Sequence, residues 1–185
     1  MGTPHSPGKI TVDDYYEMAR AGLIDPDARV ELIEGEIVAM APIGNPHGYV
    51  VDELSSRLHA LVPGRAHVRV QGALRLSNRT ELQPDLSLLK LPSEQYRQKQ
   101  ASTSDALLVI EVSDTTLRKD LRVKLPLYAK HGAPEVWIID LEKKCVRFHR
   151  SLADGQYQKV SAAPQPGLAP VPGVAGATID LANLV

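Results

Sequence analysis

The feature that most constrains this chain is a continuous apolar run at residues 106–112 that contains a single carboxylate. The run reads Ala-Leu-Leu-Val-Ile-Glu-Val, and an unbroken apolar stretch of this length is typical of a central strand covered on both faces. Glu111 stands inside it. A lone carboxylate at such a position is costly unless it is paired, protonated or bound to a metal. The fold must therefore supply Glu111 with a partner.

A second carboxylate, Asp85, opens another apolar strand in the segment Gln83-Pro84-Asp85-Leu86. Proline cannot donate a ladder hydrogen bond, so this strand begins at an end or an edge of the sheet. Carboxylates at the ends of neighbouring strands can converge on one hard cation. Mg²⁺ suits such a site, because it takes one or two carboxylates and completes its shell with water and phosphate oxygens. Asp85 and Glu111 are therefore the candidate ligands for Mg²⁺ or Mn²⁺.

Strands and helices alternate irregularly around these two positions. Helices are expected near residues 11–22, where Thr11 and Asp14 form a capping-box pattern, at 46–62 with Asn45 as the N-cap, and at 116–131. The expected strands are 29–33 and 36–41, which form an N-terminal hairpin, then 66–71, 73–76, 86–89, 106–112, 136–140, 145–149 and 156–160. Residues 164–173 are expected to pack as an extended strap. This order predicts an α/β or α+β fold around one mixed sheet.

Composition limits the class of protein. The chain has 185 residues, which suits one domain at residues 10–185 after a flexible arm at residues 1–9. With 21 basic and 22 acidic residues, it is not a general polyanion binder, and any contact with nucleic acid needs a local positive patch. Cys145 is the only cysteine, which excludes an intrachain disulfide. No signal peptide or membrane-spanning run is evident, so a cytoplasmic protein is expected.

The helix expected at 116–131 carries the required positive charge. Asp120 and Lys124 lie four residues apart and share a face. A lysine beside a metal can stabilise the charge that grows on a scissile phosphate. The helix has one acidic residue, Asp120, and its basic residues are Arg118, Lys119, Arg122, Lys124 and Lys130. This patch predicts phosphate contacts, with DNA as the expected partner.

An ordered set of segments resembles the Uma2 (formerly DUF820) family, a branch of the PD-(D/E)XK nuclease superfamily. The resembling segments are residues 29–36 (RVELIEGE), 46–48 (PHG), 84–85 (PD), 109–113 (VIEVS), 124–140 and 179–185. The resemblance covers roughly residues 10–185. It implies a restriction-endonuclease-like fold, in which a four-stranded mixed core has helices on both sides.

The resemblance also implies roles for particular residues. Pro84-Asp85 would be the superfamily's "PD" and Glu111 its "(D/E)". The chain departs from the pattern two residues later, where Ser113 occupies the position that usually carries lysine. In the Uma2 branch Lys124 would replace that lysine, although Pro126 interrupts the helix that carries it. Possible accessory residues are Glu31, His47, Glu53, Ser113 and Asp120.

Each of these residues has a structural alternative. Asp85 is also typical of a turn after proline, and Glu111 is also compatible with a purely structural ion pair to Arg75 or Arg69. Lys124 and Glu31 are also compatible with solvated surface positions. His47 is also compatible with a capping or packing role. For Glu53, an exposed helix glutamate is the favoured interpretation.

The leading hypothesis is a Mg²⁺- or Mn²⁺-dependent DNA endonuclease that acts as a homodimer, since cutting both strands of a duplex requires two active sites. The alternative from another class is a catalytically inactive nuclease-fold module that binds nucleic acid or protein. Ser113 at the usual lysine position and the balanced charge favour this alternative. A third possibility is a homo-oligomeric regulator whose basic helix forms an interface.

Overall fold

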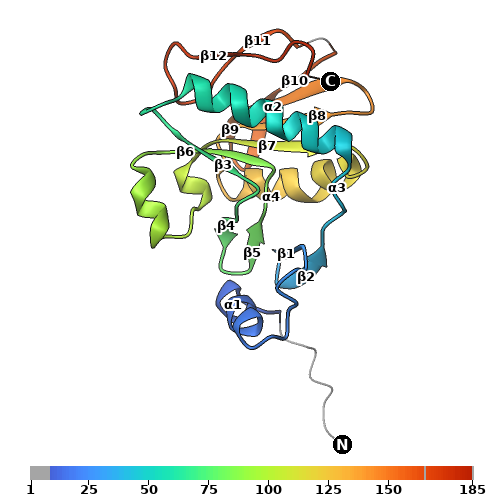
Figure 1. Cartoon of the computed structure of the whole chain (residues 1–185), viewed down its shortest axis with the longest axis vertical. Coiled ribbons are helices and arrows are strands. Elements are labelled where there is room, and N and C mark those ends of the chain that lie inside the picture. The colour runs from blue at the N-terminus through green and yellow to red at the C-terminus, as the bar shows by residue number, and fades with distance from the viewer. Residues whose placement is uncertain (1–8, 165, 185) are drawn as a thin grey trace, which may run out of the picture.

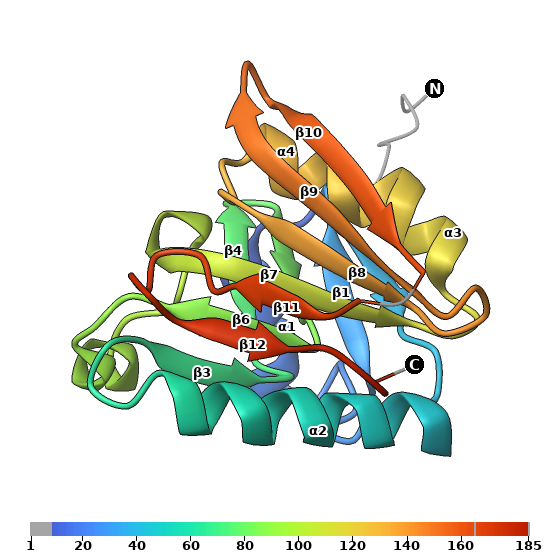
Figure 2. The ribbon, with the colours of Figure 1, turned by 90° about the horizontal axis from the view of Figure 1, so that it is seen from above.

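The main sheet of the protein has six strands. The computed structural model describes residues 9–164 and 166–184, so the arm expected at residues 1–9 lies outside the described residues except for Lys9. In spatial order the strands are β10 (Gln156–Ala163), β9 (Cys145–Ala153), β8 (Val136–Asp140), β7 (Ala106–Ser113), β6 (Leu86–Leu89) and β3 (His67–Val70). Figure 2 shows them as successive twisted ribbons.

Strand direction makes this a mixed sheet. β7 and β8 run parallel, and the other neighbouring strands run antiparallel. β7 is central, and seven of its eight residues are buried, as its apolar sequence predicts. The mixed sheet with flanking helices confirms the expected fold class. The expected four-stranded mixed core lies within this sheet, which β3 and β10 extend on its two sides.

A smaller sheet of four strands projects from the main sheet and carries the N-terminal helix (Figure 1). We call this part the wing. Its elements are α1 (Val12–Arg20), β1 (Val30–Ile33), β2 (Glu36–Ala39), β4 (Leu74–Ser77) and β5 (Thr80–Leu82). The predicted hairpin is present, and Glu34 and Gly35 form its turn with φ of 48° and 84°, as a tight hairpin requires. Strand β5 was not predicted, because three residues are too few to show a periodicity.

Helices cover both faces of the main sheet. Figure 1 shows α2 (Asn45–Leu61) above the sheet, beside the two-stranded ribbon of β11 (Leu168–Pro170) and β12 (Thr178–Asp180). Helices α3 (Leu117–Lys119) and α4 (Leu125–Lys130) lie below it. The expected strap is thus partly a strand. The N-cap of α2 is Gly44 rather than the predicted Asn45, which lies inside the helix.

Two apolar clusters correspond to these two faces. On the α2 face, Leu54 and Leu58 pack against Leu108 and Ile110 of β7. On the opposite face, Leu127 and Tyr128 of α4 pack against Val109 and against side chains of the wing. Among the described residues, no helix combines the length and the apolar content that a membrane crossing requires.

The helix predicted at 116–131 is continuous despite Pro126. Its middle, Asp120–Lys124, is a π-helical segment that connects α3 to α4. The N–H of Leu125 donates to the carbonyl of Asp120, five residues back, where an α-helix would use the fourth. Pro126 has no N–H to donate, and a wider turn just before it accommodates the missing bond. Proline therefore changes the pitch of this helix without ending it. Single π turns occur often at functional sites.

Candidate active site

The register of two strands brings Asp85 and Glu111 together. In the antiparallel pair of β6 and β7, Leu86 lies opposite Ile110. Extending this register by one residue places Asp85 opposite Glu111. Residues that are directly opposite in an antiparallel pair project from the same face, so both carboxylates point toward α3 and α4. This geometry follows from Pro84-Asp85 starting β6 and Glu111 standing near the end of β7.

Hydrogen bonds fix both carboxylates. Oδ2 of Asp85 accepts from the backbone N–H of Val112 at 2.8 Å and faces Nε2 of His47 at 3.1 Å. Oε1 of Glu111 accepts from the hydroxyl of Tyr128 at 2.6 Å. Both side chains are buried. Among the described residues, the hydrogen bonds of Asp85 use Oδ2, which leaves Oδ1 available to coordinate a cation.

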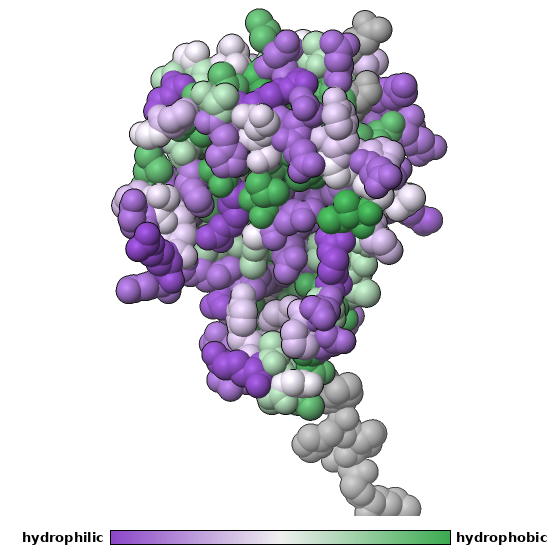
Figure 3. Space-filling view, viewed as in Figure 1, coloured by the Kyte–Doolittle hydropathy of each residue, from purple (hydrophilic) through white to green (hydrophobic). Residues whose placement is uncertain are grey.

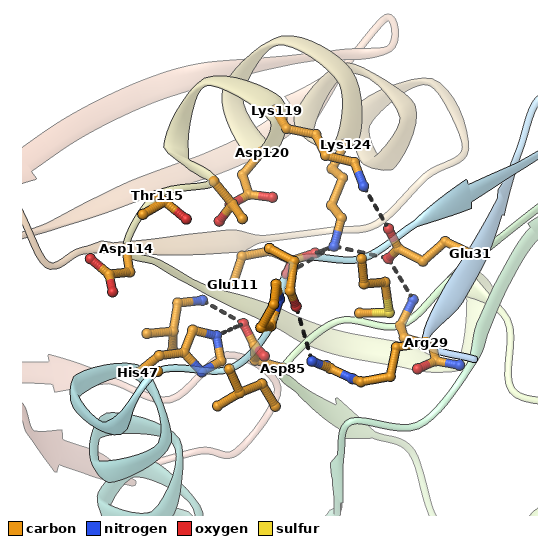
Figure 4. Close-up of a pocket in the computed structure, with 18 residues that line it drawn as sticks. Arg29, Glu31, His47, Asp85, Glu111, Asp114, Thr115, Lys119, Asp120 and Lys124 are labelled. Atoms are coloured by element: carbon orange, nitrogen blue, oxygen red, sulfur yellow. Dashed lines mark hydrogen bonds and ion pairs between the residues drawn. The ribbon is translucent and has the colours of Figure 1, made fainter. Parts of the chain in front are cut away.

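Lys124 lies between two buried carboxylates. Its Nζ is 2.9 Å from Oε1 of Glu31 and 3.2 Å from Oε1 of Glu111. Glu31 belongs to β1 of the wing, and it also accepts from the backbone N–H of Gln83 at 3.0 Å and from Nζ of Lys119 at 3.3 Å. The wing therefore supplies the shorter of the two ion pairs that hold the buried lysine (Figure 4).

Burial and charge shift the protonation of this group. Burial raises the pKa of Glu111 to about 8; Lys124 opposes the rise, while the nearby carboxylates of Asp85, Asp120 and Glu31 add to it. Burial alone would lower the pKa of Lys124, but Glu111 and Glu31 hold it above its usual value. The two shifts are compatible, because Glu31 balances the lysine charge even when Glu111 carries a proton. Bringing a cation to Glu111 would favour its ionised form.

The π-helical segment turns Asp120 toward the sheet as well. Its Oδ2 accepts from the hydroxyls of Ser113 at 2.8 Å and Thr116 at 2.6 Å. Asp120 and Lys124 are 3% and 5% exposed, so the predicted shared face is the buried one. Ser113, at the position where the superfamily usually carries lysine, orients Asp120. The lysine reaches Glu111 from the helix instead.

His47 enters the site from the first turn of α2. A carboxylate only accepts, so Nε2 is the atom that donates to Asp85. This hydrogen bond raises the pKa of His47, against the opposing effects of burial and of nearby Arg29. Nδ1 is buried and has no hydrogen-bond partner among the described residues. His47 therefore fixes the orientation of the Asp85 carboxylate.

These side chains surround a pocket with a cavity volume of about 60 Å³. That is room for an ion and a few waters, and it is far below the roughly 300–1,000 Å³ of an enclosed small-molecule site. Three basic side chains line it, those of Arg29, Lys119 and Lys124. The carboxylates that line it are Glu31, Asp85, Glu111, Asp114 and Asp120. The excess of carboxylates favours binding of a cation.

The oxygen donors fit a hard divalent metal. Among the described residues, no three His, Cys, Asp or Glu side chains are arranged to hold a metal by themselves. Mg²⁺ does not need such a cage, because it keeps several waters and binds through one or two carboxylates. Asp85 and Glu111 match that requirement. The pKa of Glu111 is raised mainly by burial, and the nearby carboxylates of Asp85, Asp120 and Glu31 add to the rise.

Comparison with known proteins identifies the family of this chain. Residues 12–182 match the Uma2 family, described as "Putative restriction endonuclease". The chain belongs to the Uma2 family. A solved structure from Anabaena variabilis, described as a "putative nuclease belonging to DUF820", has the same fold with a TM-score of 0.73. It is 20% identical in sequence, and the alignment covers 95% of this chain and 97% of that one. Among curated proteins, none matches.

The structure of this Uma2 member brings most of the predicted site residues together. Six of them line the pocket, and Ser113 contacts one of those six. The six are Glu31, His47, Asp85, Glu111, Asp120 and Lys124. Glu53 lies elsewhere: it pairs with Arg57 one turn along α2, and its side chain is 37% exposed, in agreement with the exposed helix glutamate favoured from the sequence.

Several structural alternatives were wrong. Arg75 pairs with Glu81 and Asp13, and Arg69 donates to the carbonyl of Ala73, so neither serves Glu111. Lys124 and Glu31 are buried rather than solvated. The expected basic patch is correspondingly smaller. Lys124 is inside the protein, and Lys119 and Lys130 form ion pairs with carboxylates of the wing.

Of the polar side chains at this site that were not predicted as site residues from the sequence, three carry a positive charge or donate to Glu111. They are Arg29, Lys119 and Tyr128. Tyr128 stands four residues after Lys124, and this spacing on one helix face could have identified it. Arg29 and Glu31 are two residues apart, and alternate residues of a strand share a face. No comparable signal marks Lys119, whose contact with Glu31 joins positions 88 residues apart in the chain.

Proposed function

We propose that this protein is a DNA endonuclease that requires Mg²⁺ or Mn²⁺. The observation that carries the proposal is the convergence of Asp85, Glu111 and the buried Lys124 on one small pocket of the main sheet. Membership of a family described as restriction endonucleases supports it. The similar structure from Anabaena variabilis, described as that of a nuclease, supports the same class of reaction.

Asp85 and Glu111 are the residues that would hold the metal. When bound, such a metal lowers the pKa of a water ligand and polarises the phosphate. His47 and the N–H of Val112 keep the Asp85 carboxylate in one orientation. Tyr128 does the same for Glu111 by donating to Oε1. Fixed ligands of this kind reduce the reorganisation that the reaction would otherwise require.

Lys124 supplies the positive charge for the reaction. Its ammonium is held 2.9 Å from Glu31 and 3.2 Å from Glu111. It would therefore remain paired with Glu31 if Glu111 bound a metal. From this position Nζ can stabilise the charge that develops on the scissile phosphate. The small volume of the pocket leaves the bases outside it. The site therefore suits the backbone of a nucleic acid.

The test uses supercoiled plasmid DNA with Mg²⁺ or Mn²⁺. We expect Asp85→Asn and Glu111→Gln to lower the rate of cleavage by about 10²- to 10³-fold or more. Both variants should also bind Mn²⁺ more weakly in isothermal titration. Glu53→Gln is the matched control, because Glu53 lies outside the pocket. Equal cleavage by pure Asp85→Asn and the control would refute the proposed roles.

The alternative function is that of an inactive nuclease-fold module, which Ser113 favours from the sequence. The 3.2 Å contact between Lys124 and Glu111 argues against it, since a lysine does stand beside the carboxylate. A protein that binds DNA and Mn²⁺ but leaves plasmid intact under all conditions would support the module instead.

We further propose that the active form is a homodimer, because cutting both strands of a duplex requires two active sites. Light scattering across a range of protein concentrations measures the mass directly. A purely monomeric protein that linearises plasmid in a single binding event would contradict this proposal.

A further inference from the structure

Arg29 is unusual among the charged side chains of the pocket. It directly precedes β1 of the wing, it is exposed, and it lines the pocket together with His47 (Figure 4). Lys119 and Lys124 both form ion pairs with pocket carboxylates. Among the described residues, no carboxylate lies within ion-pair distance of Arg29, although five carboxylates line the same pocket.

Four of the five pocket carboxylates are already engaged by other donors, and the fifth, Asp114, is exposed. Glu31 pairs with Lys119 and Lys124 and accepts from a backbone N–H. Asp85 accepts from His47 and from the N–H of Val112. Lys124 and Tyr128 serve Glu111. Two hydroxyl groups serve Asp120. The arrangement leaves the guanidinium of Arg29 available for an anion from outside the protein.

One hydrogen bond orients this guanidinium without using it up. Nη1 of Arg29 donates to the carbonyl of Ala41 at 3.0 Å, in the segment that leads from β2 to α2. A guanidinium has five N–H donors in a planar fork that matches the geometry of a phosphate. The contact with Ala41 fixes the side chain at the pocket and leaves most of the fork unoccupied, as a preorganised anion site requires.

Arg29 and Glu31 are only two residues apart, but their side chains make different contacts. Glu31 projects inward and holds Lys119 and Lys124, whereas Arg29, two residues earlier, stays at the exposed rim. On the face of the molecule that Figure 3 shows, the apolar side chains form small groups separated by hydrophilic ones. The charge of Arg29 is the property of this rim that can attract an anion.

We infer that Arg29 binds a backbone phosphate of the nucleic acid substrate and positions the strand over the pocket. This inference rests on the proposed function and names one contact by which the wing takes part in it. Arg29 is a substrate-binding residue here, and it acts beside the groups that would hold the metal. Its removal should weaken the binding of substrate more than it slows the chemical step.

The experiment measures the binding of a fluorescein-labelled duplex oligonucleotide by anisotropy, without added metal, over a series of salt concentrations. We expect Arg29→Ala to bind about tenfold more weakly, and the slope of log K against log salt to fall by about 0.9, the value for one lost phosphate contact. Arg29→Lys should recover part of the affinity. The control is Arg79→Ala, because Arg79 is an exposed arginine of the wing outside the pocket.

A structural role for Arg29 gives a different result. If it only supported Ala41, Arg29→Ala would lower the melting temperature and leave the salt slope unchanged. Affinity and slope equal to those of Arg79→Ala would overturn the inference. Cleavage kinetics separate it from the proposed function: we expect a raised KM with kcat nearly retained. If Arg29→Ala alters the salt slope but the unmodified protein never cleaves DNA, the proposed endonuclease activity is refuted and the phosphate contact is supported.

Discussion

The two faces of β7 differ in kind although their residues alternate along one strand. Leu108, Ile110 and Val112 face α2 and belong to the apolar cluster on that side of the sheet. Val109 and Glu111 face α4, and there the apolar cluster gives way to Glu111 with Lys124 and Tyr128. The first face contributes to stability through burial. On the second face, buried charges lie close together in place of apolar side chains, so apolar burial contributes less to stability there.

The comparison indicates how the site tolerates a carboxylate in the core. Glu111 is 3% exposed, yet it has Lys124 and Tyr128 as direct partners. A buried ion pair with its hydrogen bonds satisfied contributes little net stability, but removing one partner is expensive. We therefore expect substitutions on the α2 face to change stability alone, and substitutions on the α4 face to change the proposed chemistry as well as stability.

The largest expected effect is on the α2 face. Leu108 is fully buried among apolar side chains, so Leu108→Ala should lower the free energy of unfolding by about 2–5 kcal/mol through lost burial and a cavity. Urea denaturation measures this change. Leu168→Ala is the matched control, because Leu168 is 74% exposed and should change stability by less than about 0.5 kcal/mol. If Leu108→Ala folds but no longer cleaves DNA, the α2 face affects the chemistry as well as stability, which would contradict this prediction.

A smaller effect is expected where the wing meets the α4 face. Glu31→Gln keeps an acceptor for the N–H of Gln83 but removes the charge that anchors Lys124 at 2.9 Å. Misplacement of the lysine should lower kcat by about 10- to 100-fold. The binding of Mn²⁺ should change little, because Asp85 and Glu111 remain.

The control for this variant is Glu34→Gln. Glu34 is an exposed wing carboxylate that pairs with Lys130 at 3.5 Å, outside the pocket. Equal values of kcat for the two variants would mean that Lys124 does not depend on the wing.

The smallest expected effect is a pH dependence confined to the α4 face. The pKa of Glu111 is raised to about 8, so below this pH a metal must displace a proton in order to bind. The affinity for Mn²⁺ should therefore rise by up to about tenfold per pH unit toward pH 8 and level off above it. Isothermal titration at several pH values measures this rise. Glu111→Gln should flatten it, and an equally steep rise in that variant would assign the proton to another group.

Much of this arrangement could be predicted from the sequence because it depends on local patterns. The strand at residues 106–112, the hairpin around Glu34-Gly35 and the long helix after residue 45 each follow from a periodicity or a turn signal. Asp85 and Glu111 could be paired for the same reason, as each is a charge that interrupts an apolar strand. The four-residue spacing of Asp120 and Lys124 on the basic helix identified Lys124 as a candidate, and the resemblance to the Uma2 family gave it the place of the superfamily's lysine.

Other parts could not be predicted because they depend on the register and on contacts between distant segments. Neither β5 nor the π turn before Pro126 shows a periodicity of its own. The contact between Glu31 and Lys124 joins the wing to a helix far along the chain. Arg29 resembles any exposed arginine until the pocket places it near carboxylates of which four already have partners.

The sequence by itself determined which residues carry charge into the core, since a carboxylate in an apolar strand needs a partner wherever the chain places it. The tertiary structure decided which partner each charge has. Strand register put Asp85 opposite Glu111, the π turn directed Lys124 inward, and the wing supplied Glu31 to hold it. The physical reason is that pairing energies act over a few ångströms, and only the folded chain sets distances on that scale.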